Sequence, residues 1–254
     1  MERKFAISLA LCLTTSFLAA AEPDGWEWHH HPFFRAVATN APEAMENMLR
    51  LLEEGADPNE RVQGFAPLMV AAKASNVPAM ELLLLAGADV NAMNPEGDTA
   101  LSIAVQKSPH VVECLLAHGA CLPQEGTVAY GKLLAQIPRC PEKSLEALLR
   151  AGLDANARTE DGSTLLMRAA ALGRVDMVRV LLAAGADANV VTPRGRTSLS
   201  FAMQGQPVGQ VAEARMAIMS LLLEAGADPL RTLNGSNEFH SAAWGSRAQA
   251  LCVL

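Results

Sequence analysis

Apolar residues gather in short blocks along the chain, and a glycine follows shortly after each block. The blocks at 82–85 and 178–182, for example, stand just before Gly87 and Gly185. A glycine at this place is typical of a helix C-terminus, because glycine adopts a left-handed backbone conformation without strain. The pattern therefore predicts helices that recur along most of the chain. The glycines that end them are Gly55, Gly87, Gly119, Gly152, Gly185 and Gly226.

The spacing of these glycines, together with a second pattern between them, defines a repeat. The interval between successive glycines is nearly constant along the chain, and only the last interval is clearly longer. Some way after a glycine, a turn residue is followed by threonine, then leucine, then alanine. Copies of this marker occupy 97–104, 161–170 and 195–202, and a looser copy occupies 64–71. Both patterns keep the same phase through several copies, so the chain is predicted to be an array of similar units.

The marker resembles Thr-Pro-Leu-His-x-Ala, the signature of the ankyrin repeat, which has a period of about 33 residues. The resemblance covers residues 32–254 and implies an all-α repeat solenoid, in which each unit is a β-turn finger followed by two antiparallel helices. Such units bury their apolar faces by stacking on neighbours, so the ends need caps. We expect about six units, at 32–63, 64–96, 97–125, 126–158, 159–191 and 192–230, and a C-terminal capping half-unit at 231–254.

Two units depart from this pattern. In the fourth unit, Thr127 and the residues up to Gly131 stand where a marker is expected, and none is recognisable. The sixth unit is longer than the others, and 204–210 is predicted to form an enlarged loop between its helices. In the fifth unit, the register predicts that Leu182 is buried in the core.

Composition narrows the classes of function. Half of the 254 residues are hydrophobic but only 4% are aromatic, so the core must be built mainly from Ala, Leu, Val and Met. Small and branched residues suit thin layers of stacked helices. The net charge is -7, whereas a general nucleic-acid binder needs a basic surface. We therefore expect no nucleic-acid partner.

Residues 1–21 have the composition of a secretory signal peptide. A positively charged start precedes an apolar run at 5–18, and three alanines end the segment. The run is too short to span a bilayer as a stable helix. We expect cleavage after Ala21, export to a bacterial periplasm and no membrane insertion of the mature protein. That protein would begin with a polar and aromatic lead segment at 22–31.

Candidate catalytic and metal-binding residues are few. No Ser-His-Asp or Cys-His arrangement and no glycine-rich phosphate loop is recognisable, so we expect no enzymatic activity and no cofactor. His29, His30 and His31 could hold copper or zinc through imidazole nitrogens, but adjacent histidines rarely fix a coordination geometry. We expect no metal site, and metal handling by His29–His31 stays open as an alternative.

Four cysteines follow the predicted cleavage site, and an exported protein with an even number could form disulfides. The register argues against pairing. Cys114 aligns with Val180 at a core position, Cys121 lies at the base of a finger, and Cys140 lies near the turn between two helices. A disulfide needs Cα atoms within about 7 Å. Free or buried thiols are therefore expected for these three and for Cys252.

The fingers and first helices of ankyrin solenoids line a concave groove that binds partners. In this register the fingers are acidic toward the N-terminus and basic toward the C-terminus, an arrangement that orients a partner. Arginine and tryptophan are the residue types that most often carry binding energy, although Trp244 could instead cover the end of the solenoid. The residues that we expect to bind a partner are Arg61, Met93, Glu96, Asp98, Arg158, Leu172, Val191, Arg194, Arg196 and Trp244.

The resemblance implies a non-catalytic module that captures another protein in this groove, as a monomer. Exported bacterial ankyrin proteins of this size include immunity proteins that neutralise secreted toxins, and this is the leading hypothesis. An accessory role in periplasmic oxidative-stress defence, together with a catalase, is one alternative. Metal handling by the histidine cluster is the other.

Overall fold

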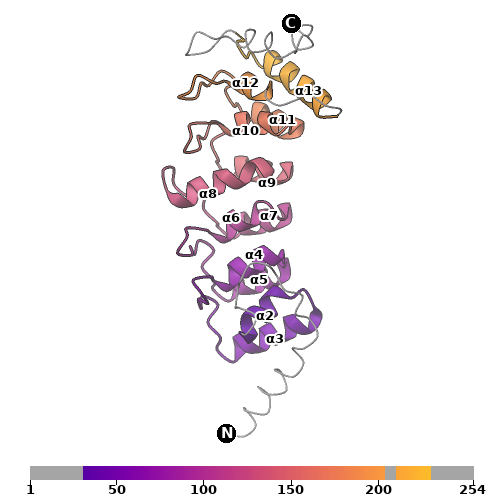
Figure 1. Ribbon diagram of the computed structural model, residues 1–254. Helices are drawn as coiled ribbons and strands as arrows, with labels where there is room; N and C mark the ends of the chain where they lie inside the picture. The colour runs from indigo at the N-terminus through magenta and orange to yellow at the C-terminus, as the bar shows by residue number, and fades with distance from the viewer. Residues whose placement is uncertain (1–30, 204–209, 230–254) are drawn as a thin grey trace.

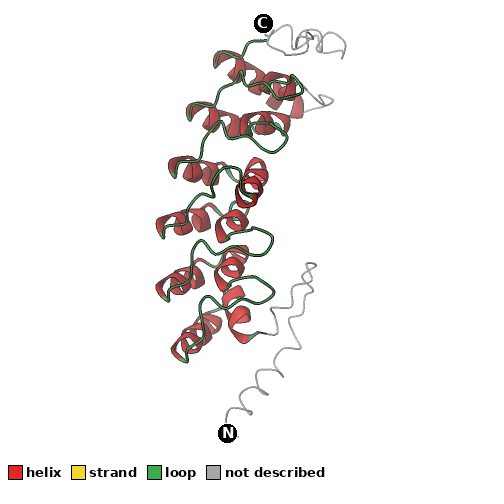
Figure 2. Cartoon of the chain, turned by 90° about the vertical axis from the view of Figure 1, so that its left-hand side faces the viewer, coloured by secondary structure: helices red, strands yellow, loops and turns green. Residues whose placement is uncertain are grey.

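The computed structural model describes residues 31–203 and 210–229, and these residues form a solenoid of stacked helix pairs (Figure 1). The predicted signal peptide 1–21, most of the lead segment 22–31, the loop residues 204–209 and the cap 231–254 lie outside the described residues. Seen from the side to which the loops project, the helices stack in two columns (Figure 2). The predicted all-α repeat solenoid is confirmed.

Each described unit consists of a first helix and a second helix that runs back beside it. The first three pairs are α2 (Pro32–Ala38) with α3 (Pro42–Glu53), α4 (Pro67–Ala74) with α5 (Val77–Leu85), and α6 (Ala100–Ala104) with α7 (Pro109–Ala117). The fourth is α8 (Val128–Gln136) and the 3-10 helix η3 (Ile137–Arg139) with α9 (Glu142–Arg150). The last two are α10 (Leu165–Ala171) with α11 (Val175–Ala183), and α12 (Ser198–Ala202) with α13 (Gln210–Glu224).

In the folded chain each finger belongs with the helix pair that follows it. A structural unit therefore runs from just after one closing glycine to the next closing glycine. The fourth unit is then 120–152, the fifth is 153–185 and the sixth is 186–226. In this division Arg158 lies on the finger of the fifth unit, and Arg194 and Arg196 lie on the finger of the sixth.

The threonine of the marker starts the first helix of a unit. The Thr99 and Thr164 hydroxyls accept hydrogen bonds from the backbone N–H groups of Ser102 and Met167, at 3.1 and 3.3 Å. These N–H groups have no partner inside their own helix, so the caps stabilise the helix starts. At the other end of each unit, the glycine turns the chain in the left-handed region, with φ of 85° at Gly185.

The leucine and the alanine of the marker form the core between units. The marker alanines are buried completely, and their small size lets the first helices approach closely. The marker leucines are also buried, with exposed fractions from 0% to 3%, and they continue the core from unit to unit. They are Leu68, Leu101, Leu133, Leu166 and Leu199.

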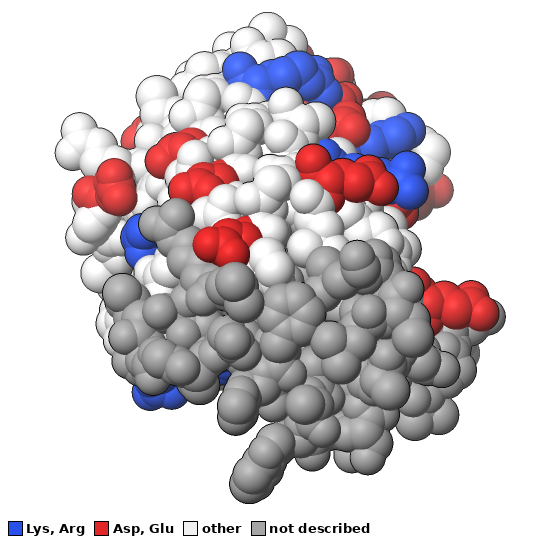
Figure 3. Space-filling view, turned by 90° about the horizontal axis from the view of Figure 1, so that it is seen from above, with Lys and Arg blue, Asp and Glu red and all other residues white. Residues whose placement is uncertain are grey.

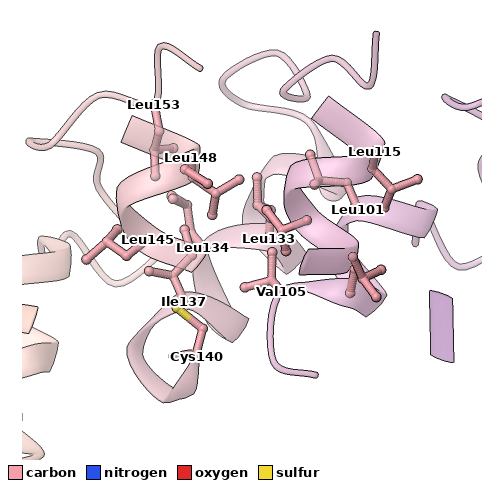
Figure 4. Close-up of a cluster of buried hydrophobic side chains, with 14 of the residues drawn as sticks. Leu101, Val105, Leu115, Leu133, Leu134, Ile137, Cys140, Leu145, Leu148 and Leu153 are labelled. Carbon is pink, nitrogen blue, oxygen red and sulfur yellow. The ribbon is translucent and has the colours of Figure 1, made fainter. Parts of the chain in front are cut away.

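The fourth unit keeps the leucine of this core, has the half-buried Gln136 in place of the alanine, and changes the finger. Leu133 stands one repeat period after Leu101 and one before Leu166. It therefore occupies the position of the marker leucine, which was not recognised from the sequence pattern. Figure 4 shows Leu133 in one cluster with Leu101. Thr127 caps α8 by accepting from the Tyr130 N–H at 3.2 Å, and α8 therefore begins one turn before the usual place.

The end of the fourth finger is therefore wound into helix. Elsewhere a backbone hydrogen bond closes the finger, as from the Asn94 N–H to the Asp98 carbonyl at 3.0 Å and from Thr159 to Ser163 at 2.9 Å. In the fourth unit the Thr127 N–H donates to the Gln124 carbonyl in a simple turn. The lack of a recognisable marker thus reflects a changed finger and the absence of the marker alanine, while the marker leucine is kept.

A ladder of asparagines joins the bases of successive fingers. The Asn59 side chain donates to the Gly87 carbonyl at 3.0 Å and accepts from the Asp89 N–H at 2.7 Å. Asn156 repeats both bonds with Gly185 and Asp187, at 3.3 and 2.7 Å. Two further asparagines, Asn91 and Asn189, do the same. Each rung satisfies two backbone groups of the next unit, so it aligns the units as well as linking them.

Two core predictions were wrong in detail. Leu182 is half-buried, and its neighbour Leu181 is completely buried instead. Both are apolar, and only the packed helix decides that positions 178 and 181 face inward. Cys114 is likewise half-buried at the edge of the core. Within the described ranges, none of the helices has the length and apolar character needed to cross a bilayer.

Candidate functional site

The fingers project from one side of the solenoid (Figure 1). In each unit the first helix comes directly after the finger along the chain. These two sets of elements line the candidate site. Of the predicted binding residues, Arg61, Met93, Glu96, Arg158, Leu172 and Arg194 are exposed. Asp98, Val191 and Arg196 are half-buried, and Trp244 lies outside the described residues.

Near the N-terminus, several predicted binding residues also hold neighbouring fingers together. The Arg61 guanidinium donates to the Met93 carbonyl of the next finger. Asp98 accepts from the Asn94 side chain at 3.3 Å and from the Lys132 ammonium at 3.0 Å. Lys132 also lies 3.7 Å from the Glu96 carboxylate. These contacts link the second, third and fourth units.

Lys132 changes the charge expected for this part of the groove. It lies on α8 and compensates two carboxylates of the third finger, Glu96 and Asp98. The acidic N-terminal surface predicted from the fingers is therefore partly neutralised by a first helix. The sequence reasoning missed Lys132 because it placed no marker in the fourth unit. The spacing between Leu101 and Leu133 is the signal that could have located α8 and its lysine.

The fifth finger is braced by Asp161, another residue that was not singled out. Its carboxylate accepts from the Thr159 hydroxyl at 2.5 Å, from the Ser163 N–H and hydroxyl at 3.2 Å each, and from Arg168 at 3.2 Å. The Thr159 hydrogen bond, the Ser163 hydrogen bonds and the Arg168 charge together lower the pKa of Asp161 to about 2, against a smaller opposing effect of burial. Asp161 therefore shapes the finger on which Arg158 and Ser163 lie.

The sixth finger presents two arginines in different settings. The Arg196 guanidinium stacks over the Phe201 ring, 4.0 Å from its centre. Burial, and secondarily the charge of Arg194, lower the pKa of Arg196. Arg196 is thus a half-buried part of the packing between finger and helix, whereas Arg194 is exposed. The sequence had treated both as surface residues.

The fingers of the fifth and sixth units carry Arg158, Arg194 and Arg196 together with the carboxylates Glu160 and Asp161. Arg158 reaches from the fifth unit to the Val191 carbonyl of the sixth at 3.5 Å, so its guanidinium lies beside the finger that carries Arg194. Leu172, at the end of α10, is 53% exposed, which is high for a leucine in a packed repeat. In the view from the C-terminal end, Asp and Glu as well as Lys and Arg lie on the finger side, at the left, and the larger groups of Lys and Arg lie elsewhere (Figure 3).

The remaining candidate residues are the histidines and the cysteines. Among the described residues there is no group of three or more His, Cys, Asp or Glu side chains that could hold a metal ion. His31 lies 3.5 Å from Glu60 and packs edge-on against Phe34, while His29 and His30 lie outside the described residues. Cys114, Cys121 and Cys140 are free thiols, and Cys252 is outside the described part. Burial raises the pKa of Cys140 to about 12.

A curved stack of helix pairs with exposed, varied side chains on its fingers defines the class of repeat solenoids that bind other proteins. Family models described as ankyrin repeats match residues 33–125 and 148–202. The two matched ranges span more than half of the chain, and the chain belongs to the ankyrin-repeat family.

Two curated relatives contain the same repeats within much longer proteins. The Caenorhabditis elegans ankyrin repeat and KH domain-containing protein mask-1 is 34% identical over 191 residues, which is 71% of this chain and 6% of that protein. The Drosophila melanogaster ARF GTPase-activating protein Git is 44% identical over 62 residues, 24% of this chain and 8% of that protein. The matched part of the chain therefore covers less than a tenth of either relative's length.

Solved structures agree on the fold. The human ASB11 ankyrin repeat domain has a TM-score of 0.70 at 24% identity and covers 87% of this chain and 96% of its own. The ankyrin repeat domain of Bcl-3 has a TM-score of 0.64 at 22% identity and covers 81% and 91%. Both likenesses support the helix-pair solenoid described above.

Proposed function

We propose that this protein is an exported bacterial immunity protein, a non-catalytic module that captures a secreted toxin in its concave groove and so neutralises it. Ankyrin repeats are protein-binding modules in general, and this part of the proposal rests on family membership. The export step rests on the signal-like composition of residues 1–21. An immunity role and a periplasmic location are the finer parts of the proposal.

The observation that carries the proposal is the set of arginines on the fingers of the fifth and sixth units. Arg158 and Arg194 are exposed on adjacent fingers, and Leu172 is an exposed apolar side chain on the first helix of the fifth unit. None of the three is needed to bury the core. Arginine is one of the residue types that most often carry binding energy at protein interfaces. The two arginines favour a partner with an acidic surface.

A charge reversal in the groove tests this proposal. The double variant Arg158→Glu and Arg194→Glu should fold normally, because exposed substitutions usually change the free energy of unfolding by only about 0.5 kcal/mol. It should lose binding by about a hundredfold or more, because like charges would face the acidic partner surface. Arg196 is left unchanged, since its stacking on Phe201 ties it to the fold.

The matched control is Arg150→Glu and Arg179→Glu, which has the same change of net charge on the second helices α9 and α11. Cells that produce each variant are challenged with the toxin encoded beside its gene, and affinity is measured with purified toxin by calorimetry. We expect the groove variant to lose protection and the control to keep it. Equal protection by both variants would refute a role for this surface. Failure of the parent protein to protect would refute the immunity function.

A further inference from the structure

The boundary between the fourth and fifth units lacks a rung of the asparagine ladder. Asn59, Asn91, Asn156 and Asn189 each stand at the same place after a unit-closing glycine, and Pro123 stands at that place after Gly119. Proline has no side-chain amide, so it can neither donate to the Gly152 carbonyl nor accept from the Asp154 N–H.

The row of fingers is interrupted at the same boundary. Elsewhere a glycine of one finger meets a side chain of the next unit: a Cβ built on Gly64 would lie 2.4 Å from Pro95, and one on Gly162 would lie 2.6 Å from Pro193. At Gly126 of the fourth unit the same construction meets nothing within 4 Å. The neighbouring Val128 side chain is 67% exposed.

The hydrogen bonds across this boundary are concentrated away from the fingers. Within the residues that the structure describes, and apart from the turn at Gly152 itself, the hydrogen bond from Arg174 to the Cys140 carbonyl, at 2.9 Å, is the sole one between the fourth and fifth units. It lies at the end of the units opposite the fingers, where η3 packs against α10. The second helices α9 and α11 also pack together. Apolar contact is thus retained on one side, while the finger side has no ladder rung.

The first helix beside this boundary also has a weak point. Gly131 lies in the middle of α8, and glycine in a helix interior costs about 1 kcal/mol relative to alanine. A Cβ at this position would lie 3.2 Å from the Glu160 carboxylate of the fifth finger. The glycine therefore lets the Glu160 side chain of the fifth finger lie against α8, at the expense of helix stability.

We propose that the boundary between the fourth and fifth units is a joint, about which units one to four and units five to six open on the finger side. The η3–α10 and α9–α11 contacts form its closed edge, and the missing rung at Pro123 forms its free edge. Opening of this kind is a local transition that leaves both blocks folded. It changes the curvature of the groove between Lys132 of the fourth unit and Arg158 of the fifth.

The joint would let the protein adjust its curvature to a captured partner. This consequence rests on the proposed function. A rigid stack offers one groove curvature, whereas a jointed stack samples several, and a ligand selects the curvature that it binds best. The fingers of the fifth and sixth units then move as one body relative to the first four units. The existence of the joint does not depend on any partner, so it can be tested on the protein alone.

Amide hydrogen exchange, measured by NMR on the full chain, tests the joint. The Asp154 N–H should exchange at least about tenfold faster than the Asp89 and Asp187 N–H groups, which donate to asparagine side chains in intact rungs. In the variant Pro123→Asn a rung is restored, and exchange at Asp154 should slow to the rate at Asp187. Pro123→Ala, which removes the proline without adding an amide, is the matched control and should leave Asp154 fast.

Asn156→Ala provides the converse variant, because it breaks an intact rung and should make Asp187 exchange as fast as Asp154. Slow exchange at Asp154 in the parent protein, or no change in Pro123→Asn, would overturn the joint. If the joint is correct and the proposed capture also holds, Pro123→Asn should alter the affinity for the toxin without any groove charge being changed. An altered exchange rate with unaltered affinity would overturn only the role of the joint in capture.

Discussion

The fourth and fifth units are equally long between their closing glycines, but they divide that length differently. The fifth unit has a closed finger and a short first helix, α10. The fourth replaces the end of its finger by an extra helical turn, so α8 is longer and continues into η3. Both units nevertheless bury their marker leucines, Leu133 and Leu166, completely. The core sets the repeat length, and the finger can vary without breaking the stack.

The comparison also separates two structural roles that a regular repeat combines: holding neighbouring units together and aligning them on the finger side. The leucines and alanines hold the units together, because they bury apolar area against both neighbours. The fingers and the asparagine ladder align the units on the groove side, because they satisfy backbone groups of the next unit. In the fourth unit the first role is kept and the second is reduced. That is the physical basis of the proposed joint.

The largest expected effect tests whether the two units share one core. Leu133→Ala and Leu166→Ala should each reduce the free energy of unfolding by about 2–5 kcal/mol, the range for a fully buried leucine. Leu172→Ala, at an exposed leucine of the same array, is the control and should change it by less than about 1 kcal/mol. Chemical denaturation followed by circular dichroism measures all three. A small effect of Leu133→Ala alone would show that the fourth unit does not keep the marker position.

Removing the N-cap of a first helix should have a smaller effect on the free energy of unfolding, and the effect should differ between α8 and α10. Thr164 is buried and caps α10, so Thr164→Ala should cost about 1–2 kcal/mol, the upper part of the range for cap removal. Thr127 is exposed and caps α8 in the finger layer, so Thr127→Ala should cost about 0.5 kcal/mol. Serine at either position keeps the hydroxyl and is the control. Equal costs at Thr127 and Thr164 would contradict the view that α8 begins in a more exposed setting.

The smallest effect is a pH dependence of the fifth finger. The folded-state pKa of Asp161 is lowered from 3.8 to about 2, so the charged form is favoured by folding. Its contribution to stability is present above pH 4 and is lost as the pH falls through about 2. The stability difference between the parent protein and Asp161→Asn should therefore shrink from pH 5 to pH 2. Thermal unfolding across this range measures it, and a constant difference would show that the carboxylate charge does not brace the finger.

The sequence determined the class of fold through residues whose role is the same in every copy. Glycine at the end of a unit, threonine at a helix start and leucine with alanine in the core follow from backbone and packing rules that act locally. The family and most of the exposed finger residues follow from these markers. Arg61, Met93, Glu96, Arg158, Leu172 and Arg194 are exposed where the register had placed them on the surface.

What only the tertiary structure decided depends on contacts between units. The sequence pattern could not choose between Leu181 and Leu182, because both are apolar and a neighbouring helix selects the one that faces inward. It could not show that Lys132 compensates Glu96 and Asp98, since Lys132 lies a whole repeat further along the chain. The stacking of Arg196 on Phe201 and the missing asparagine rung at Pro123 also depend on contacts that the sequence pattern does not show. Local rules fix the units, whereas the surface and the joint between units arise from side chains that meet only after stacking.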